Sequence, residues 1–467
     1  MAAAKIYGRE MKKHDLNIYG NEIRATLKLA IPVIAGQLGQ VMMGIVDSLM
    51  VGRLGAVPLA AASLSNAIFF LVLVVGIGVS QALTPLVAQS VGARQPENCG
   101  ILLRQGLLVC FAAGLILAAI TLGAAELVPF LNQPEPVIPL AAVYMRIMGI
   151  SIIPIMIFQA YRQYSEGLSI MWPAMLLTLA ANALNVFLNW IFIYGHLGFP
   201  AMGLKGAGLS TLGTRTAMAA IMVAYVWKSR KYKGFYSPVF KFPFQLDWKK
   251  IDAIVRIGVA TGFQYFFEVG AFTGAAVLIG WMGASPLAAH QIALSAAAFS
   301  FMFAVGVSAA AAVRVGNTKG ENNRDGIRKA GLSALVLSVL IMSSFAVLFI
   351  IFRFTIPRFF IADPNVLSLA SSLLIIAALF QVSDGLQCVA LGALRGMSDV
   401  KIPTIATFIS YWIVGLPAGY VLAFPLGFKV WGMWIGLSLG LTSSALLLTT
   451  RFHRKTKEVH EPAQPEP

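Results

Sequence analysis

The sequence has 467 residues, of which 58% are hydrophobic and only 12% are charged, and its mean hydropathy is +0.79. Soluble domains carry about 25% charged residues, so this composition excludes a water-soluble globular protein. Lysine and arginine number 35 against 19 acidic residues, which gives a formal charge of +16. In a soluble chain this excess would indicate a nucleic-acid partner. In a membrane protein it indicates basic cytoplasmic loops, and we expect no nucleic-acid partner.

Long apolar stretches predict an all-α polytopic membrane protein. The twelve predicted spans lie at 28–51, 57–82, 101–124, 137–159, 172–194, 206–227, 251–281, 286–313, 329–352, 366–391, 403–424 and 429–450. The first 22 residues contain no apolar core, which predicts that no signal peptide is cleaved. The three cysteines form no CxxC motif and indicate neither a disulfide framework nor a zinc site.

The distribution of basic residues predicts the orientation of the spans. Of the 35, 27 lie on the side that carries both termini and five lie on the other side. The positive-inside rule therefore predicts that both termini are cytoplasmic. The remaining three, Arg146, Arg215 and Arg256, fall within spans, and we expect each near a span end.

The chain is internally duplicated. A shift of 228 residues aligns 23–80 with 251–308 without a gap, and places the words Gly55-Ala56-Val57-Pro58-Leu59-Ala60-Ala61 and Gly283-Ala284-Ser285-Pro286-Leu287-Ala288-Ala289 in register. Each half holds six spans, so both halves enter the membrane from the same side. This arrangement is a parallel repeat with a pseudo-twofold axis along the membrane normal.

The duplication predicts two six-helix lobes that suit alternating access. The predicted segments are a cytoplasmic amino-terminal segment at 1–27, lobes at 28–227 and 251–450, a basic cytoplasmic linker at 228–250, and a cytoplasmic tail at 451–467.

Sixteen of the 19 acidic residues fall in loops, termini or span ends, and three remain inside predicted spans: Asp47, Glu268 and Asp384. An acidic side chain at mid-span costs roughly 2.5–3.5 kcal/mol of insertion free energy, so we expect each of these acids to have a specific structural or functional role. Asp47 lies close enough to the end of its span to reach the headgroups, and a purely structural hydrogen-bonded acid is an alternative for the other two. The shift of 228 places Gln40 opposite Glu268, so the acids are not duplicated and we expect the lobes to carry different parts of the ion chemistry.

Polar neighbours favour a functional reading of these acids. Gln264 lies one turn before Glu268, and Gln381 lies three residues before Asp384, so each acid shares a helix face with an amide. Three more amides form a stripe at spacing i, i+3, i+7: Asn182, Asn185 and Asn189. Such oxygen-rich groups suit a hard cation such as Na⁺, or a carboxylate that binds and releases a proton.

At these residues the sequence resembles the multidrug and toxic compound extrusion (MATE) transporters, in particular their NorM-like branch. The matching words are Met43-Gly44-Ile45-Val46-Asp47 with Gly52, Ala288-Ala289-His290-Gln291-Ile292-Ala293, Phe267-Glu268-Val269 and Ser383-Asp384. The resemblance extends over all twelve spans.

The resemblance implies a secondary active antiporter in a bacterial inner membrane, functional as a monomer and without a cofactor. Na⁺ or H⁺ enters as cationic drugs and dyes leave. It further implies a cation site at Glu268 and Asp384, which could hold Na⁺. In the other lobe it implies a site at Asp47, with Asn185, Asn189 and the hydroxyl of Thr211.

Two further residues stand out in this comparison. Pro32 matches a family proline that is linked to bending of the first helix, although an isolated helix proline is more often only a kink. Phe380 stands where a tyrosine is common in this branch, which removes a candidate hydroxyl ligand and weakens the case for Na⁺ over H⁺.

Other readings remain open. A lipid or polysaccharide-precursor flippase of related architecture should place several basic residues in its cavity, and only the three span arginines are candidates. An intramembrane enzyme is disfavoured because the sequence has no HExxH, GxGD or GxSxG motif. His290 could carry a proton, but a lone membrane histidine is more often a packing or hydrogen-bonding residue.

Overall fold

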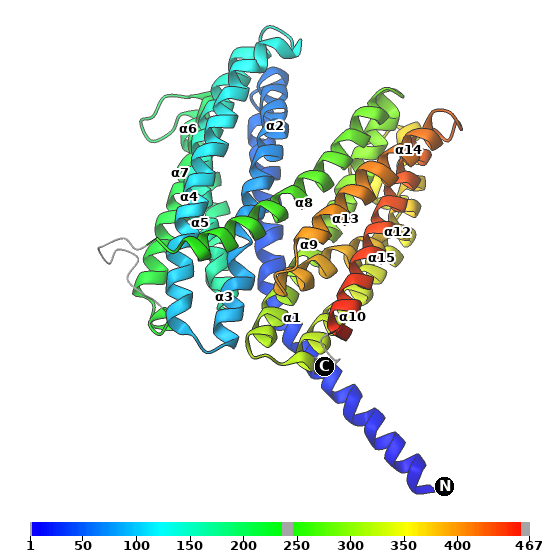
Figure 1. The fold of residues 1–467 in the computed structure, drawn as a ribbon. Coiled ribbons are helices and arrows are strands. Elements are labelled where there is room, and N and C mark those ends of the chain that lie inside the picture. Colours follow the sequence, from blue (N-terminus) through cyan, green and yellow to red (C-terminus); the bar gives the residue numbers. More distant parts are fainter. Residues whose placement is uncertain (1, 236–245, 459–467) are drawn as a thin grey trace. The chain divides into compact units, whose positions relative to one another are not determined.

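The computed structural model describes residues 2–235 and 246–458, which form helices and connecting segments without a β-strand in those ranges (Figure 1). Twelve helical segments are long and apolar enough to cross a membrane: 20–52, 56–92, 96–131, 137–167, 172–194, 203–228, 248–280, 284–320, 324–351, 364–396, 401–423 and 429–457. The prediction of an all-α protein with twelve spans is confirmed. Many helices are longer than predicted because they continue past the apolar run into polar residues.

The helices follow one another with short connections. They are α1 (Ala2–Gly52), α2 (Ala56–Ser80), α3 (Leu83–Gly92), α4 (Pro96–Leu127), α5 (Val137–Gly167), α6 (Trp172–Tyr194), α7 (Gly203–Lys228), α8 (Trp248–Gly280), α9 (Ala284–Gly320), α10 (Arg324–Ile351), α11 (Thr355–Arg358), α12 (Pro364–Gly396), α13 (Lys401–Phe408), α14 (Leu416–Ala423) and α15 (Lys429–Glu458). The eleventh span is interrupted by a π-helical turn at Ile409–Gly415. The sequence pattern did not indicate this turn.

The chain divides into two compact units. Unit 1 comprises the chain up to Ile34 and from Gly270 onward, and unit 2 comprises Ala35–Val269. Both boundaries lie inside long helices, α1 and α8, whereas the predicted lobes meet at the segment 228–250. Residues 236–245 of that predicted linker and 459–467 of the predicted tail lie outside the described residues.

The backbone repeats with the same period as the sequence. Gly55 and Gly283, which are 228 positions apart, precede helices with φ of 112° and 115°. Positive φ values of this size are accessible to glycine without strain. Arg94 and Asn322, at the same separation, adopt φ of 56° and 54°. The duplicated sequence therefore specifies duplicated turns as well as duplicated spans.

Close helix crossings at glycines also obey the repeat. In unit 2, a Cβ added to Gly78 of α2 would lie 2.4 Å from the Cα of Gly262 of α8. In unit 1, a Cβ added to Gly306 of α9 would lie 3.1 Å from the carbonyl oxygen of Ala30 of α1. Small residues permit such backbone approach in membrane helices, where packing rather than water drives association.

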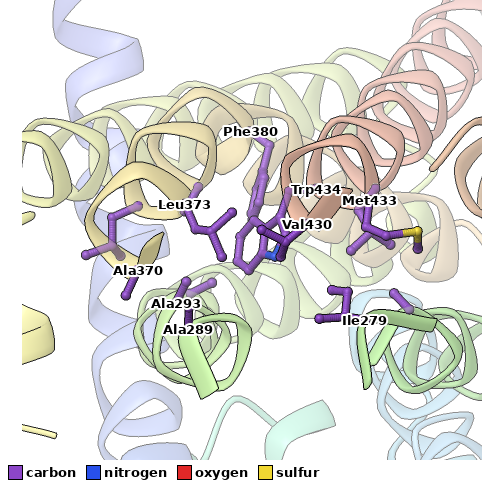
Figure 2. Packing of buried hydrophobic residues seen from close by; sticks show 14 of the residues in the cluster. Ile279, Ala289, Ala293, Ala370, Leu373, Phe380, Val430, Met433 and Trp434 are labelled. Carbon is purple, nitrogen blue, oxygen red and sulfur yellow. The ribbon is translucent and has the colours of Figure 1, made fainter. Parts of the chain in front are cut away.

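A buried apolar cluster holds α8, α9, α12 and α15 together in unit 1 (Figure 2). The ring of Phe380 on α12 stacks on Trp434 of α15 with centroids 5.7 Å apart. Ala289 and Ala293 on α9 are fully buried in the same cluster. Small alanines opposite large rings allow these helices to interdigitate.

Candidate ion-coupling sites

The Asp47 site in unit 2 brings together four of the predicted residues. Asn189 donates a hydrogen bond from Nδ2 to Oδ1 of Asp47 at 2.6 Å, and the same Nδ2 lies 3.2 Å from Oδ1 of Asn185. The side chains of Asn185 and Thr211 also interact with the Asp47 carboxyl group. The consecutive helices α6 and α7 thus converge with the distant helix α1 on one carboxylate.

Helical spacing and burial explain this convergence. Asn185 and Asn189 are one turn apart on α6, so their side chains lie on the same face, and both are fully buried. The hydroxyl of Thr211 donates to the carbonyl oxygen of Ala207 in its own helix at 3.1 Å, which leaves its oxygen lone pairs available. Oδ1 of Asn189 is buried without a hydrogen-bond partner among the described residues.

This oxygen set has the chemistry of a hard-cation site. It combines one carboxylate, two amides and one hydroxyl, which are the donor types that cations such as Na⁺ or Ca²⁺ accept. Over residues 2–235 and 246–458, no group of three or more His, Cys, Asp or Glu side chains could hold a metal. The Asp47 site would therefore suit a weakly held monovalent cation or a proton better than a transition metal.

Asn182 is separated from this cluster. Its Nδ2 donates to the carbonyl oxygen of Gly39 on α1 at 3.0 Å and to that of Thr178 at 3.1 Å. Its contact on α1 therefore lies two turns before Asp47. The third member of the predicted stripe connects α6 to the backbone of α1 rather than to the carboxylate.

A basic residue that was not among the predicted site residues lies near Asp47. Arg215 occupies the middle of α7, so the expectation that it lies near a span end is wrong. It interacts electrostatically with Asp47 and with Tyr144 of α5. Arg146 and Arg256, by contrast, are exposed and paired with Glu126 and Asp252.

Glu268 lies on α8 within unit 2, near the end of that unit at Val269. It is 8% exposed, and Gln264 one turn earlier is 3% exposed. The ring of Phe267 stacks on Phe263 with centroids 5.8 Å apart, so the buried acid and amide are flanked by aromatic side chains. A carboxyl group in such a setting is poorly hydrated, as the sequence predicts for a mid-span acid.

Asp384 lies on α12 in unit 1 and is 6% exposed. Oε1 of the fully buried Gln381 accepts a hydrogen bond from Oγ of Ser300 on α9 at 3.1 Å. A Cβ at Gly385 would lie 2.6 Å from Oγ of Ser338, so this glycine lets α10 approach the helix that carries the acid. Asp384 and Glu268 are thus both buried, in separate units.

Three residues singled out in the sequence have clear structural positions. Phe380 is 2% exposed in the apolar cluster, where its ring contacts Trp434. Nδ1 of the fully buried His290 accepts a hydrogen bond from Nε1 of Trp434 at 3.1 Å. Pro32 lies inside α1, two residues before the boundary between the units at Ile34.

The MatE family model matches this sequence in two stretches, residues 32–191 and 260–421. The two matches begin 228 residues apart, which is the period of the repeat. The chain belongs to the MatE family. Membership confirms the predicted NorM-like MATE resemblance, and the protein is a multi-pass bacterial membrane transporter rather than an enzyme.

Relatives resemble this MatE protein over nearly its whole length. It is 36% identical to a probable multidrug resistance protein NorM of Mesorhizobium japonicum, with 94% of this chain and 96% of the relative covered. It is 33% identical to the multidrug resistance protein NorM of Aliivibrio fischeri, with coverage of 93% and 95%.

Solved structures share its fold. An outward-facing multidrug resistance MATE family transporter of the MOP superfamily matches with a TM-score of 0.87 at 19% identity, covering 95% of this chain and 98% of that chain. A eukaryotic MATE transporter matches with a TM-score of 0.85 at 19% identity, covering 95% and 99%. The fold of this chain is therefore the fold of these two solved transporters.

Proposed function

We propose that this MatE protein is a secondary active multidrug efflux antiporter. It exports cationic or amphipathic organic compounds, such as drugs and dyes, in exchange for Na⁺ or H⁺. It acts as a monomer in the bacterial inner membrane with both termini in the cytoplasm, and two six-helix lobes, 28–227 and 251–450, alternate access. The names of the NorM relatives support multidrug export.

One observation supports the ion-coupled part of the proposal: three acidic residues lie within spans, and each has an amide side chain nearby. Asp47 accepts a hydrogen bond from Asn189. Glu268 and Asp384 are each more than nine-tenths buried, near an amide. We assign cation or proton binding to these three residues. Asn185, Asn189, Thr211, Gln264 and Gln381 are the supporting polar ligands, and Asn182 supports them by fixing α6 against α1.

Coupling follows from competition between ion and drug. A buried carboxylate that loses its ion must be neutralised or rehydrated, because an isolated charge is unfavourable in a low-dielectric interior. Either a cationic drug or a coupling cation can neutralise the carboxylate. If each stabilises a different arrangement of the lobes, binding of one favours release of the other.

The test is efflux of ethidium from proteoliposomes, driven separately by imposed Na⁺ and pH gradients. We expect Glu268→Gln and Asp384→Asn to abolish ion-driven efflux while the protein still inserts. Asp252→Asn removes an exposed acid on the same helix as Glu268 and should leave efflux unchanged. Unchanged extrusion in both site variants would refute the site assignment, and transport that collapses only with the pH gradient would exclude Na⁺ as the coupling ion.

The flippase alternative receives one supporting observation, the mid-span position of Arg215. An anionic lipid headgroup would need several such charges, and Arg146 and Arg256 are exposed and paired with acids. Of these three arginines only Arg215 lies at mid-span, and it interacts electrostatically with Asp47, which balances its charge. A drug antiporter is therefore the better fit.

A further inference from the structure

Arg215 is held in unit 2 by contacts with neutral groups. Its Nη1 donates to Oγ of Ser151 on α5 at 2.6 Å. Its Cζ lies 4.9 Å from the ring centroid of Phe69 on α2. The hydroxyl of Tyr144, which lies 3.4 Å from Oδ1 of Asn66, also faces this region. These contacts fix the guanidinium but supply no negative charge.

The negative charge that balances Arg215 comes from Asp47. Among the described residues, Arg215 forms no direct ion pair, and the acid that interacts with it electrostatically is Asp47. Asp47 has Arg215 as its basic partner in turn, next to its amide and hydroxyl neighbours. Asp47 and Arg215 are both partly buried, and partly buried charges interact over several ångströms because salt and water screen them less than at the surface.

The position of Arg215 beside the oxygen ligands disfavours binding of a metal cation at Asp47. Arg215 lies one turn after Thr211 on α7, so it lies beside the oxygens that would coordinate a cation. The donor set of Asp47, Asn185, Asn189 and Thr211 suits Na⁺, but a positive charge already lies beside it. A second monovalent cation would meet that charge without a second carboxylate to offset it.

We propose that Arg215 is the resident counterion of Asp47 and the residue that determines ion specificity at this site. With the guanidinium in place, the Asp47 site does not retain a metal cation, and any Na⁺ bound by the protein is held at another acid, Glu268 in unit 2 or Asp384 in unit 1. The inference deepens the proposed antiport function, since it assigns different ions to the acidic sites.

Equilibrium binding of radioactive Na⁺ to the purified full-length protein tests this assignment. Asp47→Asn should bind as many Na⁺ ions per chain as the parent protein, with the same dissociation constant. Arg215→Gln should bind one Na⁺ more than the parent. Combining Asp47→Asn with Arg215→Gln should remove that additional ion.

Two further variants separate charge from structure. Arg215→Lys keeps the positive charge and should bind Na⁺ as the parent does. Arg215→Met removes the charge and the bond to Ser151 together, and should gain the same additional ion as Arg215→Gln.

The proposal is overturned if Asp47→Asn alone loses a bound Na⁺, or if neither neutral variant of Arg215 gains one. Binding is measured without transport. Failure of the protein to export ethidium would refute the antiport proposal. The number of bound Na⁺ ions would still test the role of Arg215.

Discussion

Asn189 and Asp47 are joined by a 2.6 Å hydrogen bond that connects α6 to α1 across 142 positions of sequence. Hydrogen bonds to charged groups contribute about 1.5–3 kcal/mol. We therefore expect Asn189→Leu to weaken ion-driven efflux by about tenfold or more, since 1.4 kcal/mol corresponds to tenfold. Ethidium efflux at a series of ion gradients measures this effect.

Asn182→Ala is the matched control on the same helix. Its side chain bonds the backbone carbonyl of Gly39 and not the carboxylate, and interhelical hydrogen bonds in membranes average about 0.6 kcal/mol. We expect a small decrease in thermal stability and unchanged dependence of efflux on the ion. Equal loss of ion dependence in the two variants would contradict the separation of their roles.

Gly78 and Gly306 should be intolerant of side chains. A Cβ at Gly78 would meet backbone at 2.4 Å, and a Cβ at Gly306 would meet Cγ1 of Ile34 at 2.3 Å. Overpacking costs typically 1–3 kcal/mol, so Gly78→Ala and Gly306→Ala should lower the melting temperature in detergent. Gly123→Ala, where nothing lies within 4 Å, should be neutral or slightly stabilising because alanine favours helix. A Gly78→Ala melting temperature equal to the parent's would mean that α2 and α8 separate readily.

The Arg162–Glu166 pair on α5 should matter more to stability than any exposed pair. Its two side chains are 6% and 5% exposed and bond at 2.8 Å. Removing one partner of a buried pair costs about 3–5 kcal/mol because it leaves an unbalanced charge. Arg162→Ala should thus lower folded yield and melting temperature strongly. Arg146→Ala, which breaks an exposed pair with Glu126, should change stability by about 0–1 kcal/mol; comparable losses in the two would refute this ranking.

His290 should act in packing and hydrogen bonding rather than as a proton carrier. It is fully buried and accepts a hydrogen bond from Trp434. Trp434→Phe removes that donor and should cost about 1–3 kcal/mol of stability. His290→Gln, which keeps an acceptor, should leave the dependence of efflux on the pH gradient unchanged. A variant that is stable but no longer responds to the pH gradient would restore His290 as a coupling residue.

Much of the fold could be predicted because membrane helices are specified by local composition. The apolar runs predicted all twelve spans, and the 228-residue shift aligned Gly55 with Gly283, which the structure places in equivalent turns. The π-helical turn at Ile409–Gly415 was not predicted. It lies where Gly415 packs against Gly440 of α15, a tertiary contact that hydropathy does not encode.

The Asp47 cluster was predicted in part. Helical spacing placed Asn185 and Asn189 on one face, and both lie by the acid. The same spacing also included Asn182, which contacts α1 two turns away, because a stripe on one helix does not show how far along its neighbour each residue reaches. Arg215 was considered for the topology and as a cavity charge of a flippase, but not as part of the Asp47 site. A basic residue in the middle of a span is as unfavourable as a mid-span acid and equally indicates a functional role.

The path of α1 and α8 has a mechanical consequence. Each helix begins in one compact unit and ends in the other, so two continuous helices connect the units. A change in the position of one unit relative to the other must therefore bend or twist these helices, near Pro32 in α1 and near Gly270 in α8. The same two helices carry Asp47 and Glu268. If these carboxylates bind the coupling ion as we propose, its binding and release act on the helices that join the two units.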